Sequence, residues 1–283
     1  MDQLRGMLKG ALAKQEAEME ERMKMPRLDR LAVTHPEGFN VESLGHWITA
    51  CAKANIEFVP ATCLTELDIE LILEFDSHPP KLIEAFKLIN EAKAPNHMLR
   101  WDVCAPYDVK YGMSKGTHEW NDSYLNLSPD DPRAFDLIYG FPALTMPIWL
   151  RPWVKAQIVD SYPVEYRVFV LDSEVIGVSN YYPQRPLADT YETQSDVQAA
   201  IQRTNQIVSK IELPWNSPKM KRLGFHTDTV SCTLDFLKTA DGEILFLEGG
   251  PPHHQVWGAH PCCFQPGKIK GIALEDRNEK GSN

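Results

Sequence analysis

Two acidic residues, Asp235 and Glu248, lie inside two apolar, strand-like runs near the end of the chain. Between the runs stands Asp241-Gly242, a pair typical of a two-residue hairpin turn, in which both residues have positive φ. Counting outward from such a turn gives the opposed pairs Leu237 with Phe246 and Asp235 with Glu248. Opposed side chains in a sheet lie roughly 5 Å apart at Cβ, where like charges are destabilising.

Such an acidic pair needs a proton on one carboxyl group or a cation between the two. Two carboxylates at this spacing suit Mg²⁺, which prefers oxygen ligands and shares its shell with phosphate oxygens. Without metal the pair should repel, so replacing either acid by its amide should cost no stability. Two other interpretations stay open. A bulge would send the acids to opposite faces, and a lysine such as Lys238 would cap either acid.

The composition is that of a globular protein, with 283 residues, of which 43% are hydrophobic and 24% charged. A net charge of −10 without a basic cluster disfavours nucleic acid as a partner. The six cysteines include no C-x-x-C pair, which indicates reduced thiols. The chain shows no signal peptide and no apolar run of membrane-spanning length, so we expect a cytoplasmic protein.

The elements fall into successive regions. Residues 1–25 predict a helical arm, either partly exposed or serving as the contact of a homo-oligomer, and residues 271–283 a flexible tail. Residues 26–140 predict an α/β lobe, with a helix capped by Asn40 and a second helix within PPKLIEAFKLINEA. Residues 141–270 alternate like strands, with a hairpin turning at the DSE of residues 172–174 and a helix over 194–212 capped by Ser195.

The order of these pieces resembles the C-terminal core of the ATP-grasp family, in particular a compact clade of such ligases often found in phage genomes. The matching stretches are WLRPWVKAQIV, EYRVFVLDSEVIGVSNYY and SCTLDFLKTADGEILFLEGGPP. The resemblance implies an α+β, ATP-grasp-like fold. It combines an antiparallel β-sheet lobe with packed helices, which binds the nucleotide, and an N-terminal α/β lobe. A phage-encoded member would work in the host cytoplasm.

The resemblance also implies roles for particular residues. A strand cation, Lys155 or Arg151, would contact the phosphates of ATP, and the backbone at Gln157, Ile158 and Val159 would hold the adenine. Arg167 would reach a phosphate or the acyl phosphate, which makes Arg167 and Lys155 the expected catalytic residues. Asp235 and Glu248 would hold Mg²⁺, the same two acids that the hairpin register selects.

The implied activity is ATP-dependent ligation of a carboxylate to an amine or a thiol through an acyl phosphate. ATP and Mg²⁺ would be the cofactors, with small-molecule or peptide carboxylates and amines as substrates. Two features depart from the family: Gly250 stands where many members have asparagine, and a glycine-rich lid is absent from WLRPWVKAQIV. The alternatives are a phosphotransferase on the same scaffold and a catalytically weak or inactive binding or virion-associated protein.

Overall fold

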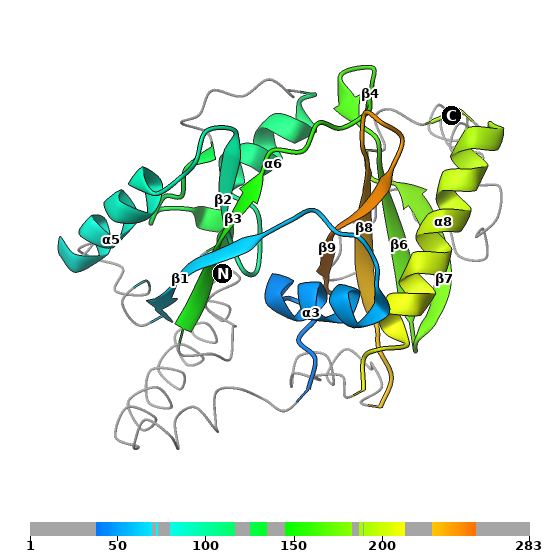
Figure 1. The fold of residues 1–283 in the computed structure, drawn as a ribbon, viewed down its shortest axis with the longest axis horizontal. Helices are drawn as coiled ribbons and strands as arrows, with labels where there is room; N and C mark the ends of the chain where they lie inside the picture. Colours follow the sequence, from blue (N-terminus) through cyan, green and yellow to red (C-terminus); the bar gives the residue numbers. More distant parts are fainter. Residues whose placement is uncertain are drawn as a thin grey trace, which may run out of the picture.

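The computed structural model describes residues 38–69, 72, 80–116, 125–134, 145–182, 187–188, 190–212 and 228–252. The predicted arm over residues 1–25 and the predicted tail over 271–283 lie outside these ranges. The described residues form a three-stranded and a four-stranded sheet, a short two-stranded hairpin, and the helices that pack on the sheets (Figure 1).

The first sheet has three antiparallel strands in the order β1-β3-β2. They are β1 (Thr62–Asp68), β2 (His97–Trp101) and β3 (Thr145–Pro152). Helix α5 (Pro80–Glu91) begins at the predicted proline, and it buries Leu82, Phe86 and Ile89, whose spacing places them on one helical face. Helix α6 (Tyr107–Ser114) follows β2 and lies beside the sheet in Figure 1.

The second sheet has four antiparallel strands in the order β7-β6-β8-β9. They are β6 (Glu165–Leu171), β7 (Glu174–Asn180), β8 (Cys232–Lys238) and β9 (Ile244–Gly250). The short strands β4 (Ile158–Val159) and β5 (Tyr162–Pro163) form a separate hairpin just before β6. The helices α3 (Leu44–Ala54) and α8 (Tyr191–Val208) pack on this sheet (Figure 1). Antiparallel sheets with separately packed helices confirm the predicted α+β class.

The two helices that pack on the second sheet have N-cap residues other than the predicted ones. Helix α8 starts after Thr190, whose hydroxyl oxygen accepts a hydrogen bond from the Thr193 N–H at 3.2 Å, so Ser195 is not the cap. Helix α3 starts after Ser43 rather than Asn40. The Asn40 side chain instead accepts the Glu42 N–H at 2.9 Å, which forms a turn before the helix.

The packing of the two sheets does not follow the predicted boundary between residues 140 and 141. Strand β3 lies beyond that boundary, yet it is the central strand of the first sheet. Helix α3 lies before it, yet its buried Trp47 and Cys51 belong to the core of the second sheet. The stretch after α3 also joins the second sheet, because the Val59 N–H donates to the Phe246 carbonyl at 2.9 Å. Along the described residues the chain therefore crosses between the sheets twice, between α3 and β1 and between β3 and β4.

The hairpin of β8 and β9 places Asp235 opposite Glu248, as the sequence predicts, but by another route. Its loop has three residues, 240–242, and only Gly242 has a positive φ, of 89°. The loop is thus a turn closed by a glycine bulge instead of the predicted two-residue turn, and Phe246 pairs with Phe236 rather than Leu237. A second bulge, between Asp235 and Phe236 in the register, restores the predicted pairing of the two acids.

Gly249 lies where the core leaves no space for a side chain. A Cβ atom built there would lie 2.1 Å from the ring of Trp47, which is fully buried. We expect Gly249→Ala to lower the free energy of unfolding by about 1–3 kcal/mol, since the Trp47 ring must shift. Urea unfolding will measure this change.

Gly250→Ala is the matched control, because the nearest atom to its added Cβ is Thr233 Oγ1 at 3.4 Å, an ordinary contact. The control should stay within about 1 kcal/mol of the wild type. Equal losses in the two variants would contradict the steric role of the Trp47 ring.

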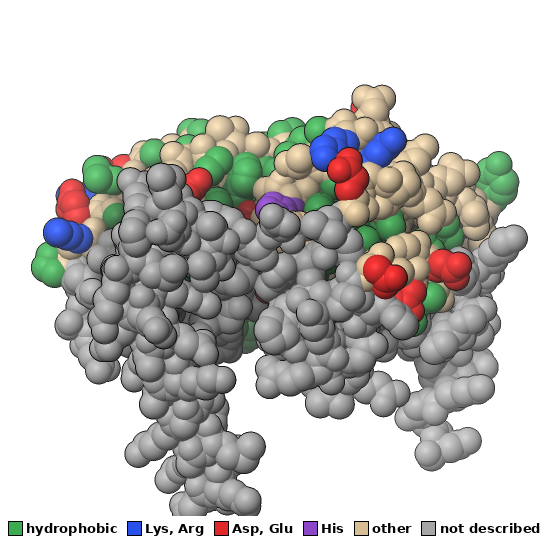
Figure 2. Space-filling model, turned by 90° about the horizontal axis from the view of Figure 1, so that it is seen from below, with side chains coloured by type: hydrophobic (Ala, Val, Ile, Leu, Met, Phe, Trp, Pro, Cys, Tyr) green, Lys and Arg blue, Asp and Glu red, His purple; other side chains and the backbone are tan. Residues whose placement is uncertain are grey.

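The described surface gives two further findings. On the described part of the face in Figure 2, Lys and Arg side chains lie beside acidic ones rather than gathering in one broad patch. None of the described helices is long and apolar enough to cross a lipid bilayer.

Candidate functional site

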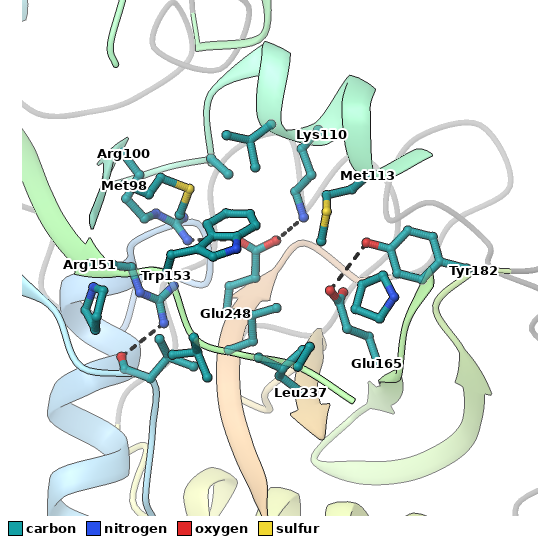
Figure 3. A pocket seen from close by; sticks show the side chains of 18 of the residues that line it. Met98, Arg100, Lys110, Met113, Arg151, Trp153, Glu165, Tyr182, Leu237 and Glu248 are labelled. Carbon is teal, nitrogen blue, oxygen red and sulfur yellow. Dashed lines mark hydrogen bonds and ion pairs between the residues drawn. The ribbon is translucent and has the colours of Figure 1, made fainter. Parts of the chain in front are cut away.

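A pocket lies between the two sheets, beneath helix α6 (Figure 3). Its walls are mostly apolar, with side chains from both sheets, from α6 and from the segment that joins β3 to β4. The apolar lining residues include Met98, Val109, Met113, Trp153, Ile158 and Leu237. Its charged lining residues are Arg100, Lys110, Arg151, Glu165 and Glu248. An apolar pocket with a few convergent charges is the usual form of a small-molecule site.

Glu248, on β9, holds two basic side chains that come from the first sheet and from α6. Its Oε2 accepts from Arg100 Nη1 and its Oε1 from Lys110 Nζ, each at 2.8 Å. The side chains of Arg100 and Glu248 are only 3% and 12% exposed. Burial alone would raise the pKa of Glu248, but Lys110 and Arg100 outweigh it and hold that pKa well below its usual range.

Asp235, on β8, forms a bidentate ion pair with Arg167 of the neighbouring strand β6. Arg167 Nε and Nη2 donate to its two carboxylate oxygens at 2.7 and 2.6 Å. The ring of Tyr181 connects this pair to the one at Glu248. Its centroid lies 4.5 Å from the Arg167 guanidinium carbon and 5.1 Å from Lys110 Nζ.

Arg151 is a buried cation whose hydrogen-bonding capacity is only partly used. Its Nη2 donates to the Val59 carbonyl at 3.0 Å, whereas Nε and Nη1 have no partner among the described residues. The residue is 1% exposed and lines the pocket. Burial and the neighbouring Arg100 lower its pKa to about 9, so it stays charged at neutral pH. A buried cation with two open donors can accept an anionic ligand.

Glu165 is a buried carboxyl group at the other side of the pocket. Its Oε1 accepts from the Tyr182 hydroxyl at 3.3 Å, and its Oε2 has no partner within the described part of the chain. Burial raises its pKa from 4.5 to about 7.

This pKa predicts a loss of stability as the pH rises. Between pH 4.5 and about 7 the folded protein keeps a proton on Glu165 that the unfolded chain has released, so stability falls across this window. The full loss is about 3 kcal/mol. We expect Glu165→Gln to remove it, and urea unfolding at about pH 5 and about pH 8 will measure it. The exposed Glu174 gives the control variant, Glu174→Gln, which should keep the pH dependence. A wild-type stability that rises across the same window would contradict the assignment.

The acidic pair does not fit a magnesium centre in this arrangement. All four carboxylate oxygens of Asp235 and Glu248 already accept hydrogen bonds from Arg167, Arg100 and Lys110. Within the described ranges, no group of three or more His, Cys, Asp or Glu residues could hold a metal ion. Neither Mg²⁺ between the acids nor the suggested Lys238 cap accounts for the pair. Lys238 instead binds Asp196 and Glu192 on α8, each at 2.6 Å.

Only some of the residues predicted to bind the nucleotide line the pocket. Arg151 and Ile158 line the pocket. Lys155 is exposed and lies outside the set of lining residues. The Gln157 backbone is already used, because its N–H donates to the Lys238 carbonyl at 2.8 Å and its carbonyl accepts the Val164 N–H at 2.9 Å. Val159 pairs with Tyr162 in the β4–β5 hairpin.

Three charged residues of the pocket had not been predicted. Arg100 and Lys110 lie far from the other site residues in sequence and carry no recognisable motif. Glu165, however, stands two residues before Arg167 on one strand, so the period of a strand would have placed both on the same face.

Comparisons with known proteins give partial similarities. No model of a known protein family matches the chain. It is 32% identical over 128 residues to the translation initiation factor eIF2 assembly protein of Kluyveromyces lactis, a match to 38% of this chain and 33% of that protein. The match thus spans about a third of the length of this relative.

The similar solved structures are of ATP-grasp fold proteins. C-terminally truncated Cdc123 from Schizosaccharomyces pombe has a TM-score of 0.45 and 14% identity, with 75% of this chain and 83% of that chain covered. N5-carboxyaminoimidazole synthase from Aspergillus clavatus, in complex with ADP, has a TM-score of 0.36 and 12% identity, with 76% of this chain and 45% of that chain covered. D-alanine-D-alanine ligase from Coxiella burnetii has a TM-score of 0.36 and 10% identity, with 78% of this chain and 51% of that chain covered.

Proposed function

We propose that this protein binds ATP in the pocket between the two sheets and uses it in a ligase-type reaction. The observation that carries the proposal is Arg151, a buried cation with two open donors in a pocket with apolar walls. The apolar walls suit a planar base, and the cations suit phosphate groups. The ligase chemistry is supported by the sequence resemblance to ATP-grasp ligases.

In such a reaction a substrate carboxylate oxygen attacks the γ-phosphorus of ATP. The bond from that phosphorus to the bridging oxygen breaks, and ADP leaves with the electron pair. An amine or a thiol then attacks the acyl carbon and phosphate departs. The protein forms no covalent bond to the substrate, and its task is to hold the phosphates and neutralise their charge. Arg151, Arg100 and Lys110 line the pocket and would do this.

A second candidate is a nucleotide-binding protein that assists the assembly of other proteins without ligation. The match to the Kluyveromyces lactis assembly protein supports it. Gly250 supports it too, because it supplies no side chain where many ATP-grasp ligases carry asparagine.

The proposal is tested by thermal unfolding with and without ATP or ADP. A nucleotide at 100 times its Kd should stabilise the fold by about 2.7 kcal/mol. A melting temperature that both nucleotides leave unchanged would contradict nucleotide binding. ADP release in the presence of a carboxylate pool and hydroxylamine, which traps acyl phosphates, then separates the candidates. Binding without such release favours the assembly protein.

A further inference from the structure

The carboxylates that would hold a metal ion are already neutralised by the protein's own cations. We infer that Arg100 and Lys110 take the place of a divalent cation, and that the pocket binds nucleotide phosphates without one. This inference rests on the proposed nucleotide site. Figure 3 shows Glu248 in the middle of the pocket, with Arg100 on one side and Lys110 on the other.

The two cations are fixed in place by contacts on different elements. Arg100 belongs to β2, and its Nε also donates to the Trp101 carbonyl at 3.0 Å. Lys110 belongs to α6, has a side chain that is 21% exposed, and contacts the Tyr181 hydroxyl at 3.5 Å. The start of α6 is itself held, because the Tyr107 N–H donates to Asp131 at 2.9 Å. Displacing either cation would leave a buried charge without its partner, which is costly.

The balance of charge in the pocket also favours an anionic ligand without a metal ion. The pocket lining carries three cations, Arg100, Lys110 and Arg151, against the carboxyl groups of Glu165 and Glu248. Burial favours the neutral form of Glu165, so the pocket has an excess of positive charge. A divalent ion at Glu248 would add two positive charges beside two existing ones. A polyphosphate without metal has the sign that this lining attracts.

Among the described residues, no third His, Cys, Asp or Glu joins Asp235 and Glu248 in a group that could hold a metal ion. Gly250, two residues beyond Glu248 on the same strand, has no side chain, and among the described residues the neighbour of a Cβ there would be Thr233 Oγ1, at 3.4 Å. Gly250 therefore supplies no side-chain ligand beside Glu248. Asp235 and Glu248 are paired with arginine and lysine instead.

The experiment is calorimetric titration of the full chain with ADP and with a non-hydrolysable ATP analogue, in excess EDTA and in excess MgCl₂. We expect the two dissociation constants to agree within about threefold. Affinity that improves more than about tenfold with MgCl₂ would overturn the inference while leaving nucleotide binding intact. Absence of binding in both buffers would instead contradict the proposed function and, with it, this inference.

Variants of Lys110 test directly whether this side chain replaces a divalent cation. Lys110→Met should weaken binding in EDTA by about tenfold or more, and MgCl₂ should restore part of the loss. Lys110→Arg should keep metal-independent binding, and it replaces the methionine variant if that one does not fold. The control is Lys115→Met, at an exposed lysine whose Nζ lies 5.5 Å from the Tyr111 ring centroid, outside the pocket lining. Wild-type affinity of Lys110→Met in EDTA would show that Lys110 does not replace the metal.

Discussion

Replacing Arg151 by methionine is expected to weaken nucleotide binding by about 100-fold, because a buried charged partner of the phosphates is removed. The same change should leave stability within about 1 kcal/mol of the wild type or raise it. The buried guanidinium has two donors without a partner among the described residues and only one hydrogen bond, to Val59, to lose. Met98, its partner on β2, shows that a methionine side chain is already accommodated beside it.

A loss of nucleotide affinity without a loss of stability distinguishes a ligand-binding role of Arg151 from a structural one. Calorimetric titration gives the affinity, and urea unfolding gives the stability. Lys155→Met is the control, because Lys155 is an exposed cation just beyond the same strand and does not line the pocket. It should retain wild-type affinity. A large loss of stability in Arg151→Met with unchanged affinity would mean that Arg151 only supports the fold.

Replacing Glu248 by glutamine is expected to lower the free energy of unfolding by about 3 kcal/mol. The amide removes the negative charge that neutralises Arg100, whose side chain is 3% exposed, and Lys110. The sequence alone predicts no loss of stability from this replacement, because without metal two opposed acids should repel. The structure instead predicts a loss, since each acid has its own basic partner.

Glu243→Gln is the matched control for this change, because Glu243 lies exposed in the same hairpin. It should stay within about 0.5 kcal/mol of the wild type. Urea unfolding without nucleotide measures both variants. A Glu248→Gln protein as stable as the wild type would show that the ion pairs with Arg100 and Lys110 contribute no net stability.

The pairing of Asp235 with Glu248 could be predicted from the sequence, but only because two local errors cancel. The predicted loop is one residue shorter than the observed one, and the unpredicted bulge shifts the register back. The positive-φ pairs expected at Asp241-Gly242 occur instead at Asp160-Ser161 and at Asp172-Ser173, within the predicted DSE turn. The conformation of an Asp-Gly pair depends on how its flanking strands meet, which a short stretch of sequence does not contain.

The partners of the acids could not be predicted, for a different reason. Arg100 and Lys110 are 148 and 138 residues away from Glu248 along the chain. Contacts at that distance follow from how the two sheets pack, and strand alternation carries no such information. Arg151 was named through the family resemblance and lines the pocket, whereas Lys155, named in the same way, lies beyond the end of β3 at Pro152 with an exposed side chain outside the lining.

Because the chain crosses between its sheets, the protein should not divide into two independently folding fragments at a single point of the sequence. A recombinant fragment beginning at β3 would lack α3, so the ring that covers Gly249 would be missing and an apolar face would meet water. A fragment ending before β3 would leave β1 and β2 without the strand that separates them. Truncation at the boundary expected from the sequence should therefore yield aggregating pieces, whereas co-expressed halves have complementary surfaces through which to reassemble.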